Sequence, residues 1–170
     1  MKLNSLKVAV LAVSLAFTAG CAKKPPKELP PAPSESGAQE TPSGVGNAIV
    51  PGSRADFLQS VPSDKIYFDT DLSNIDDQDR AVLDAQAGWL QRYPNVRVTI
   101  EGHCDERGTR EYNLALGDRR ANAAKNYLQS RGIDPGRMAV ISWGKERPEA
   151  VGSDEESWAR NRRAVTVVPQ

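Results

Sequence analysis

Two polar side chains in the second half of the chain have the spacing of a binding groove. Asn113 and Arg120 are seven residues apart in a segment of helical pattern, so they project from one face about 10 Å apart along the axis. An amide and a guanidinium can both hydrogen-bond a ligand. Residues 101–109, just before them, indicate a strand end and a polar turn that contains glycine. A ligand lying in this groove can contact both side chains.

The helix that must position these two residues has a recognisable start and end. Thr109 is a suitable N-cap, Glu111 suits the positive end of the helix dipole, and Gly132 favours termination. One apolar stripe along the helix is formed by Leu114, Gly117, Ala121, Ala124 and Leu128. Its small residues allow the helix to approach a sheet closely. Because Asn113 and Arg120 lie at the edge of the stripe, we expect them at a boundary between core and solvent.

The remaining pattern predicts strands that alternate with helices. Apolar residues recur at helical spacing over residues 76–92, whereas residues 96–101 alternate between apolar and polar as in a half-buried strand. The predicted strands are 65–68, 96–101, 138–142 and 164–168, and the other predicted helix is 154–160. This β-α-β-α-β-α-β order indicates an α/β chain of the α+β two-layer type, with helices on one face of a mixed four-stranded sheet. We expect this domain to span residues 53–170.

The N-terminus has the pattern of a targeting segment. Its apolar run, residues 8–17, is well short of the roughly 20 residues that a membrane span needs, which predicts a signal peptide over residues 1–20. The small residues before Cys21 resemble the lipobox of bacterial lipoproteins, with Thr18 where Leu is usual. We therefore expect Cys21 to be acylated and to become the mature N-terminus. A secretory signal with an incidental cysteine is the alternative.

The segment from Cys21 to residue 52 is rich in Pro, Ser and Gly and poor in apolar side chains. Such a composition cannot offset the entropy lost on ordering, so we expect a disordered tether between the acylated cysteine and the domain. Across the chain, 22 basic residues balance 22 acidic ones. No overall field therefore favours a nucleic-acid partner.

Three titratable residues, His103, Asp105 and Glu106, follow the second predicted strand. They raise the alternative of a wall hydrolase that uses a carboxyl group as general acid. The single histidine cannot furnish a typical zinc site, and no H-E-x-x-H motif exists. Adjacent residues of an extended segment also point apart. We therefore expect no catalytic residues, no metal and no cofactor, and a Cys104 that packs as a small buried hydrophobe.

The predicted helix carries a family motif. Residues 113–128 read N-x-x-L-G-x-x-R-A-x-x-A-x-x-x-L, which resembles the signature N-x-x-L-S-x-x-R-A-x-x-V-x-x-x-L of the OmpA-like peptidoglycan-binding family. Gly117 and Ala124 replace the family's Ser and Val on the packing stripe, so they affect helix docking more than the ligand. Further matching runs are E-G-H-C-D-E-R-G-T at 101–109, Y-F-D-T-D at 67–71 and N-R-R-A-V at 161–165. The resemblance covers about residues 56–168.

This resemblance implies a site for the meso-diaminopimelate of the peptidoglycan stem peptide. The family's ligand-binding Asp and Arg correspond to Asp105 and Arg120. The other residues implied are Asn113, Arg162 and Arg163 as further contributors, with Phe68 and Asp69 as the opposing wall. Diaminopimelate ends in an ammonium and a carboxylate on one carbon. Asp105 would pair with the ammonium, and Arg120 would bind the carboxylate with two hydrogen bonds. Taken singly, either residue could instead belong to a surface ion pair.

The resemblance extends to the lipoprotein members of the family, which also have a lipobox and a Pro-rich tether. It implies an outer-membrane protein anchored in lipid through Cys21, with its domain in the periplasm, that supports envelope integrity and cell division. It also implies partners in the Tol system, above all TolB, on a surface that overlaps the wall-binding region. A module that binds only another envelope protein is the alternative, with Tyr112, Trp143 and Trp158 as aromatic anchors.

Overall fold

The structure, a computed structural model, describes residues 49–169. The predicted signal peptide, Cys21 and most of the predicted tether lie outside the described residues. The elements are α1 (Arg54–Ser60), β1 (Lys65–Tyr67), α2 (Asp77–Arg92), β2 (Val98–His103), α3 (Arg110–Ser130), the 3-10 turn η1 (Pro135–Arg137), β3 (Met138–Gly144), α4 (Glu155–Asn161) and β4 (Arg163–Val167). The predicted order of four strands and three helices is confirmed, and α1 and η1 are additional. Within the described part of the chain, no helix is long and apolar enough to cross a membrane.

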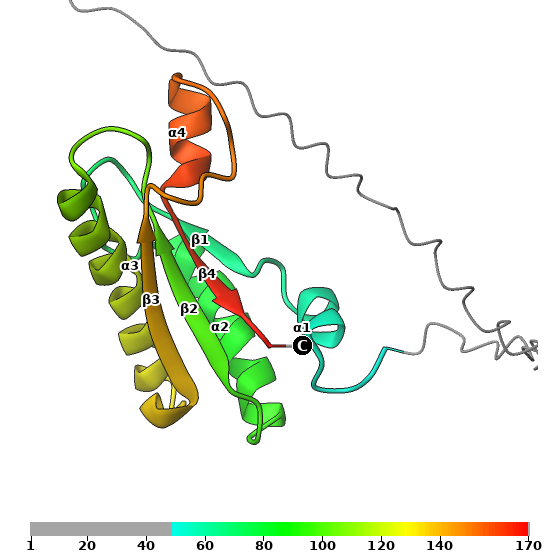
Figure 1. Ribbon diagram of the computed structural model, residues 1–170. Helices are drawn as coiled ribbons and strands as arrows, with labels where there is room; N and C mark the ends of the chain where they lie inside the picture. The colour runs from blue at the N-terminus through cyan, green and yellow to red at the C-terminus, as the bar shows by residue number, and fades with distance from the viewer. Residues whose placement is uncertain (1–48, 170) are drawn as a thin grey trace, which may run out of the picture. The chain divides into compact units, whose positions relative to one another are not determined.

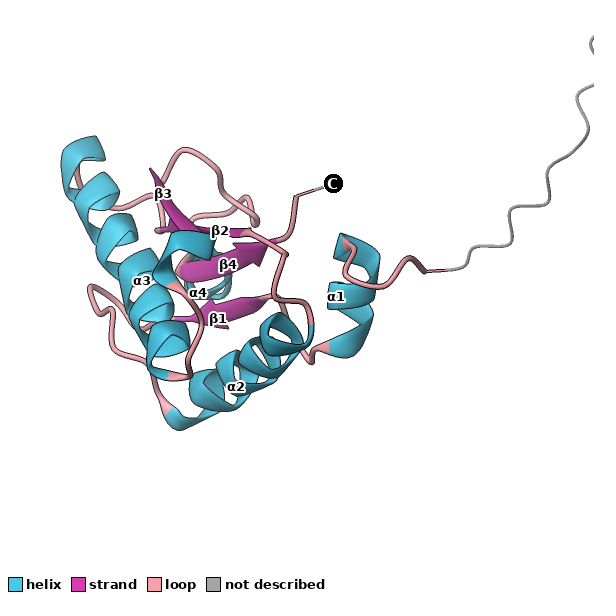
Figure 2. Cartoon of the chain, turned by 90° about the horizontal axis from the view of Figure 1, so that it is seen from below, coloured by secondary structure: helices cyan, strands magenta, loops and turns pink. Residues whose placement is uncertain are grey.

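The four strands form one mixed sheet in the order β1-β4-β2-β3 (Figures 1 and 2). Strands β2 and β3 are parallel, whereas β4 lies antiparallel between β1 and β2. Helix α3 supplies the long crossover that two parallel strands require. Gln86 of α2 accepts a hydrogen bond from Thr166 of β4, and α3 packs on Gly102 of β2, a residue that the strand register places on the same face as Thr166. Helices α2 and α3 therefore cover one face, as predicted.

The hydrophobic core lies between this face and the helices. It includes Ile66, Val98, Ile100, Leu83, Leu90, Ala121 and Leu128. The short helix α1 adds Phe57, whose ring meets Trp89 edge-on with the ring centres 4.9 Å apart. The predicted cap of α3 is confirmed, since the Thr109 hydroxyl accepts a hydrogen bond from the N–H of Tyr112. The cap fixes where the helix begins, directly after the polar turn.

A contact between two glycines sets the distance from α3 to the sheet. A Cβ atom on Gly102 of β2 would lie only 1.8 Å from the carbonyl oxygen of Gly117 in α3. Only glycine fits such an approach, so the predicted close docking of the helix is confirmed. It brings the first half of α3 against the end of β2, where the predicted site residues lie.

The buried stripe of α3 differs from the predicted one in register. Leu114 is only half-buried, whereas Leu116 is 2% exposed and belongs to the buried face. Asn113 and Arg120 were expected at the edge of the stripe, and this is wrong because both lie inside it, 2% and 0% exposed. Burial of these two polar side chains demands partners for them, and the partners define the site.

Candidate functional site

A cavity of about 260 Å³ lies where the loop after β1, the turn after β2 and the first turns of α3 meet. It is lined by Thr70, Asp71, Cys104, Asp105, Arg107, Gly108, Tyr112, Asn113, Leu116 and Arg120. Gly108 has a φ of 84°, a left-handed conformation that suits glycine and allows the chain to turn from Asp105 into α3. The structure thus brings Asp105, Asn113 and Arg120 to one cavity.

Arg120 is a buried cation whose hydrogen-bond partners are all neutral. Its Nε, Nη1 and Nη2 donate to the carbonyl oxygens of Leu72, His103 and Asp69 at 2.9, 2.9 and 3.0 Å. These bonds tie α3 to the end of β2 and to the loop after β1. Within residues 49–169, Arg120 forms no ion pair with a carboxylate. Burial is the main cause that lowers the pKa of Arg120, and the charge of Asp105 offsets it only in part.

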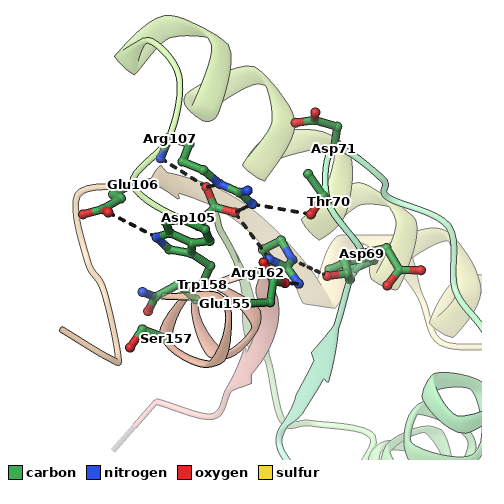
Figure 3. A network of polar contacts seen from close by, with 12 residues as sticks. Asp69, Thr70, Asp71, Asp105, Glu106, Arg107, Glu155, Ser157, Trp158 and Arg162 are labelled. Atoms are coloured by element: carbon green, nitrogen blue, oxygen red, sulfur yellow. Dashed lines mark hydrogen bonds and ion pairs between the residues drawn. The ribbon is translucent and has the colours of Figure 1, made fainter. Parts of the chain in front are cut away.

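Asp105 is also buried, 7% exposed, but its charge is compensated (Figure 3). Its Oδ2 accepts a hydrogen bond of 2.6 Å from Nη2 of Arg107, and its Oδ1 accepts from the N–H and Nε of the same residue, each at 3.1 Å. Arg162 adds a second cation, with its Nη1 3.6 Å from Oδ2. Burial alone would raise the pKa of Asp105, but the bonds to Arg107 outweigh it and hold the pKa below its usual value. Asp105 is therefore an ionised anion at neutral pH.

Asn113 organises the turn. Its Nδ2 donates to the carbonyl oxygens of Arg107 and Thr109 at 2.7 and 3.1 Å, and its own carbonyl accepts from the Cys104 thiol at 3.3 Å. Burial raises the pKa of Cys104, so the thiol stays protonated. Asn113 and Cys104 thus hold the turn in shape, while the charged side chains of the cavity lining are Asp71, Asp105, Arg107 and Arg120.

The wall opposite α3 is formed by residues other than those predicted. Thr70 and Asp71 line the cavity, and Asp71 accepts a hydrogen bond of 3.1 Å from the hydroxyl of Tyr112. Asp69 contributes its carbonyl oxygen to Arg120, but its side chain points away from the Asp105 network (Figure 3) and lines a separate cavity. The ring of Phe68 lies beneath the Arg120 guanidinium, 5.2 Å from ring centre to Cζ. Phe68 and Asp69 therefore support the cation rather than face the cavity.

The two predicted arginines at the start of β4 separate. Arg162 lies with Asp105 and donates through Nε to the carbonyl oxygen of Phe68 at 2.9 Å. Arg163 points to the opposite face of the sheet, where its Nε lies 3.0 Å from Glu149 in a different cavity. Its placement with the wall-binding residues is not supported by this geometry, because side chains of consecutive residues in extended chain point apart.

His103 also lies on that opposite face. Its ring is 2% exposed, with Nε2 3.5 Å from Glu101. Burial, followed by the charge of Arg163, lowers the pKa of His103 to about 4. His103 and Asp105 line different cavities, because strand β2 ends at His103 and the chain turns before Asp105. In the described part of the chain, no group of three or more His, Cys, Asp and Glu side chains is placed to hold a metal ion.

Comparison with known proteins decides the family. The OmpA family matches residues 67–162. The peptidoglycan-associated lipoprotein of Agrobacterium fabrum (strain C58) is 51% identical over 161 residues, covering 94% of this chain and 86% of the relative. That of Rhizobium meliloti (strain 1021) is 53% identical over 161 residues, covering 93% and 84%. The chain belongs to the OmpA family, in its group of peptidoglycan-associated lipoproteins.

Solved structures agree with an OmpA-like fold. The crystal structure of the peptidoglycan-associated lipoprotein from Burkholderia pseudomallei matches with a TM-score of 0.61 at 46% identity, covering 62% of this chain and 89% of that one. The cell wall anchor of the T6SS from Pseudomonas aeruginosa matches with a TM-score of 0.56 at 26% identity, covering 71% and 100%. The predicted fold and family are therefore confirmed.

Four polar side chains of this OmpA-family cavity were not among the predicted wall-binding residues, although Tyr112 was considered as an anchor for a protein partner. They are Thr70, Asp71, Arg107 and Tyr112. Asp71 and Tyr112 are far apart in sequence and meet only in the fold. A sequence signal existed for two of them. Arg107 is two residues from Asp105, within reach of its carboxylate. Asp71 lies in a segment whose composition indicates a turn, and its φ of 59° in the structure agrees.

Proposed function

We propose that this chain is an outer-membrane lipoprotein whose domain binds the diaminopimelate-containing stem peptide of peptidoglycan without covalent chemistry. It thereby tethers the outer membrane to the cell wall within the Tol-Pal system and contributes to envelope integrity and cell division. Arg120 carries this proposal, because a fully buried cation that has no carboxylate partner among residues 49–169 lines an open cavity. Leaving a buried charge uncompensated is costly, so such a site favours an anionic ligand group.

The chemistry of the cavity suits a zwitterion. Three of the five N–H groups of the Arg120 guanidinium are used by carbonyl oxygens, which leaves two for a ligand carboxylate. Asp105 offers the complementary anion for the ammonium on the same carbon. The names of the relatives, which describe lipoproteins associated with peptidoglycan, support the same ligand.

Sedimentation with purified sacculi tests wall binding. The full chain should sediment with them, and free meso-diaminopimelate should release it. Asp105→Ala should lose most of this binding, because the ammonium then lacks its anion. Glu106→Ala is the matched control, since this neighbouring carboxylate is exposed and bonds Trp158 instead. A wild-type chain that stays in solution, or an Asp105→Ala chain that sediments as well as the control, contradicts the proposal.

The anchor and the protein partner are parts of the same proposal. Acylation of Cys21 would place the domain in the periplasm at the end of the predicted Pro-rich tether. Mass spectrometry of the mature protein tests it, and an unmodified Cys21 would reject the anchor.

TolB is the proposed protein partner, on a surface that overlaps the cavity. Sacculi should therefore compete with TolB for the domain, whereas simultaneous binding of both would reject a shared surface.

A further inference from the structure

The carboxylate that the proposed ligand needs is already occupied. Both oxygens of Asp105 accept hydrogen bonds from Arg107: Oδ1 from the backbone N–H and Nε, and Oδ2 from Nη2 at 2.6 Å (Figure 3). This is the two-pronged geometry in which an arginine binds a carboxylate most strongly. A ligand ammonium needs the same oxygens. It would be a third cation beside Arg107 and Arg162 at one carboxylate, and repulsion among three like charges favours the loss of one of them.

Other contacts hold the Arg107 guanidinium less firmly. It stacks on the Trp158 ring with Cζ 4.2 Å from the ring centre, and Nη2 reaches the Thr70 hydroxyl at 3.4 Å. The side chain of Arg107 is 40% exposed, whereas that of Asp105 is 9% exposed. The guanidinium can therefore swing into solvent on its flexible stem, while Asp105 stays in place.

Asp105 keeps a cation when Arg107 leaves. The side chain of Arg162 is 7% exposed and is fixed by bonds to the Phe68 carbonyl at 2.9 Å and to Glu155 at 2.8 Å. Its Nη1 faces Asp105 from the side of α4. The Asp105 subsite thus has one fixed cation, Arg162, and one removable cation, Arg107.

We propose that Arg107 is an internal occupant of the ammonium position and that the ligand must displace it, which makes Arg107 a specificity-determining residue. This inference rests on the proposed function. Binding of a ligand ammonium forms a contact with Asp105 but breaks the Asp105–Arg107 ion pair. The presence of Arg107 therefore weakens the affinity for such a ligand. A ligand without the ammonium leaves Arg107 in place and does not meet this competition.

Arg107→Gln in the full chain tests the competition, because it removes the charge and keeps the backbone N–H that bonds Asp105 and the carbonyl that Asn113 binds. Calorimetry would compare a soluble diaminopimelate stem peptide with an analogue whose side-chain ammonium is replaced by hydrogen. The variant should bind the ammonium peptide about tenfold tighter, the size of one charge-assisted contact. It should bind the analogue no tighter than wild type. Arg110→Gln, an equal charge change at an exposed residue paired with Glu146, should match wild type with both peptides.

The outcomes separate this inference from the proposed function. Wild-type binding of the ammonium peptide with equal or weaker binding by Arg107→Gln overturns the inference alone, since Arg107 would then be neutral or a ligand contact. A wild-type chain that binds neither peptide rejects the proposed function and the inference with it. NMR of the Arg107 Nε–H in wild type gives a readout without mutation: the peptide should speed its exchange with water, and unchanged protection overturns the inference.

Discussion

Two buried arginines lie on opposite faces of the sheet and differ in what neutralises them. Arg163 is 7% exposed and has the carboxylate of Glu149 3.0 Å from its Nε. Arg120 is 0% exposed, and in the part of the chain that the structure describes its hydrogen bonds all go to carbonyl oxygens. Burial is the first cause of a lowered pKa in both; the charge of Glu149 opposes it for Arg163, and the charge of Asp105, which forms no ion pair with Arg120, opposes it for Arg120. The protein pairs Arg163 with its own carboxylate, whereas Arg120 lies beside a cavity in which we propose that a ligand carboxylate binds.

The largest expected effect is that of Arg120→Gln. The proposed ligand carboxylate loses its cation, and the carbonyl oxygens of His103, Leu72 and Asp69 lose the hydrogen bonds of the guanidinium; the bond to His103 is buried. We expect stem-peptide binding to fall at least about 100-fold and the free energy of unfolding to fall by about 2–4 kcal/mol. Calorimetry and urea titration measure the two.

Arg119→Gln is the matched control, because Arg119 is the exposed neighbour in the same helix. It should bind as wild type. A folded Arg120→Gln chain that still binds the stem peptide would remove the distinction between the two arginines.

A smaller change in the ligand sharpens the same comparison. A stem peptide whose diaminopimelate carboxylate is converted to an amide should bind the wild-type chain about 10–100-fold more weakly, because Arg120 then keeps its uncompensated charge. Equal affinity for acid and amide would show that Arg120 does not need an anion. Arg163→Gln should leave this ratio unchanged, since Arg163 lies in another cavity.

Residues on the sheet face that carries His103 and Arg163 should affect stability rather than ligand binding. His103 has a pKa of about 4 in the folded chain against 6.5 for an unperturbed histidine, so the unfolded chain binds the proton more readily. The stability from its neutral form is complete above pH 6.5 and is lost as the pH falls toward 4. We expect the free energy of unfolding to fall by about 2–3 kcal/mol over this window.

Urea titrations at several pH values measure this slope, and His103→Gln should flatten it. Carboxylates with lowered pKa, such as Asp105 and Glu149, lose their contribution at more acidic pH, so they affect mainly the lower end of the window. An unchanged slope in His103→Gln would show that the His103 face does not set the acid response.

The smallest effect is expected at the cavity wall. Tyr112→Phe removes the hydroxyl that donates to Asp71, a bond between exposed side chains. Such bonds contribute little, so we expect stem-peptide binding to weaken about twofold. A loss larger than tenfold would mean that Tyr112 contacts the ligand and that the division between charged site and supporting wall is wrong.

Helix α3 and the alternating strands were predictable because their signals are local. Thr109 caps the helix through its own side chain, and glycines at positions 102 and 117 indicate that the helix lies close to the sheet. Helix α1 was missed because it has only seven residues and buries only Phe57, too little for a periodic pattern. Strand β2 was placed two residues early, because Val96 continues the alternation without joining the sheet.

The site was less predictable because its pairing is not local. The motif located Asp105 and Arg120, but not the carbonyl oxygens of Asp69, Leu72 and His103 that hold the guanidinium. The motif also grouped Arg162 with Arg163, which the fold sends to opposite faces. Sequence spacing shows which side chains exist, whereas the fold decides which charges remain unpaired.

The most direct test of the central claim is a crystal structure of the chain with a diaminopimelate stem peptide. We expect the carboxylate of the diaminopimelate head to lie within about 3 Å of the Arg120 guanidinium, in the cavity beside Asp105. A peptide bound on the opposite face near Arg163, or one whose carboxylate avoids Arg120, would contradict the account.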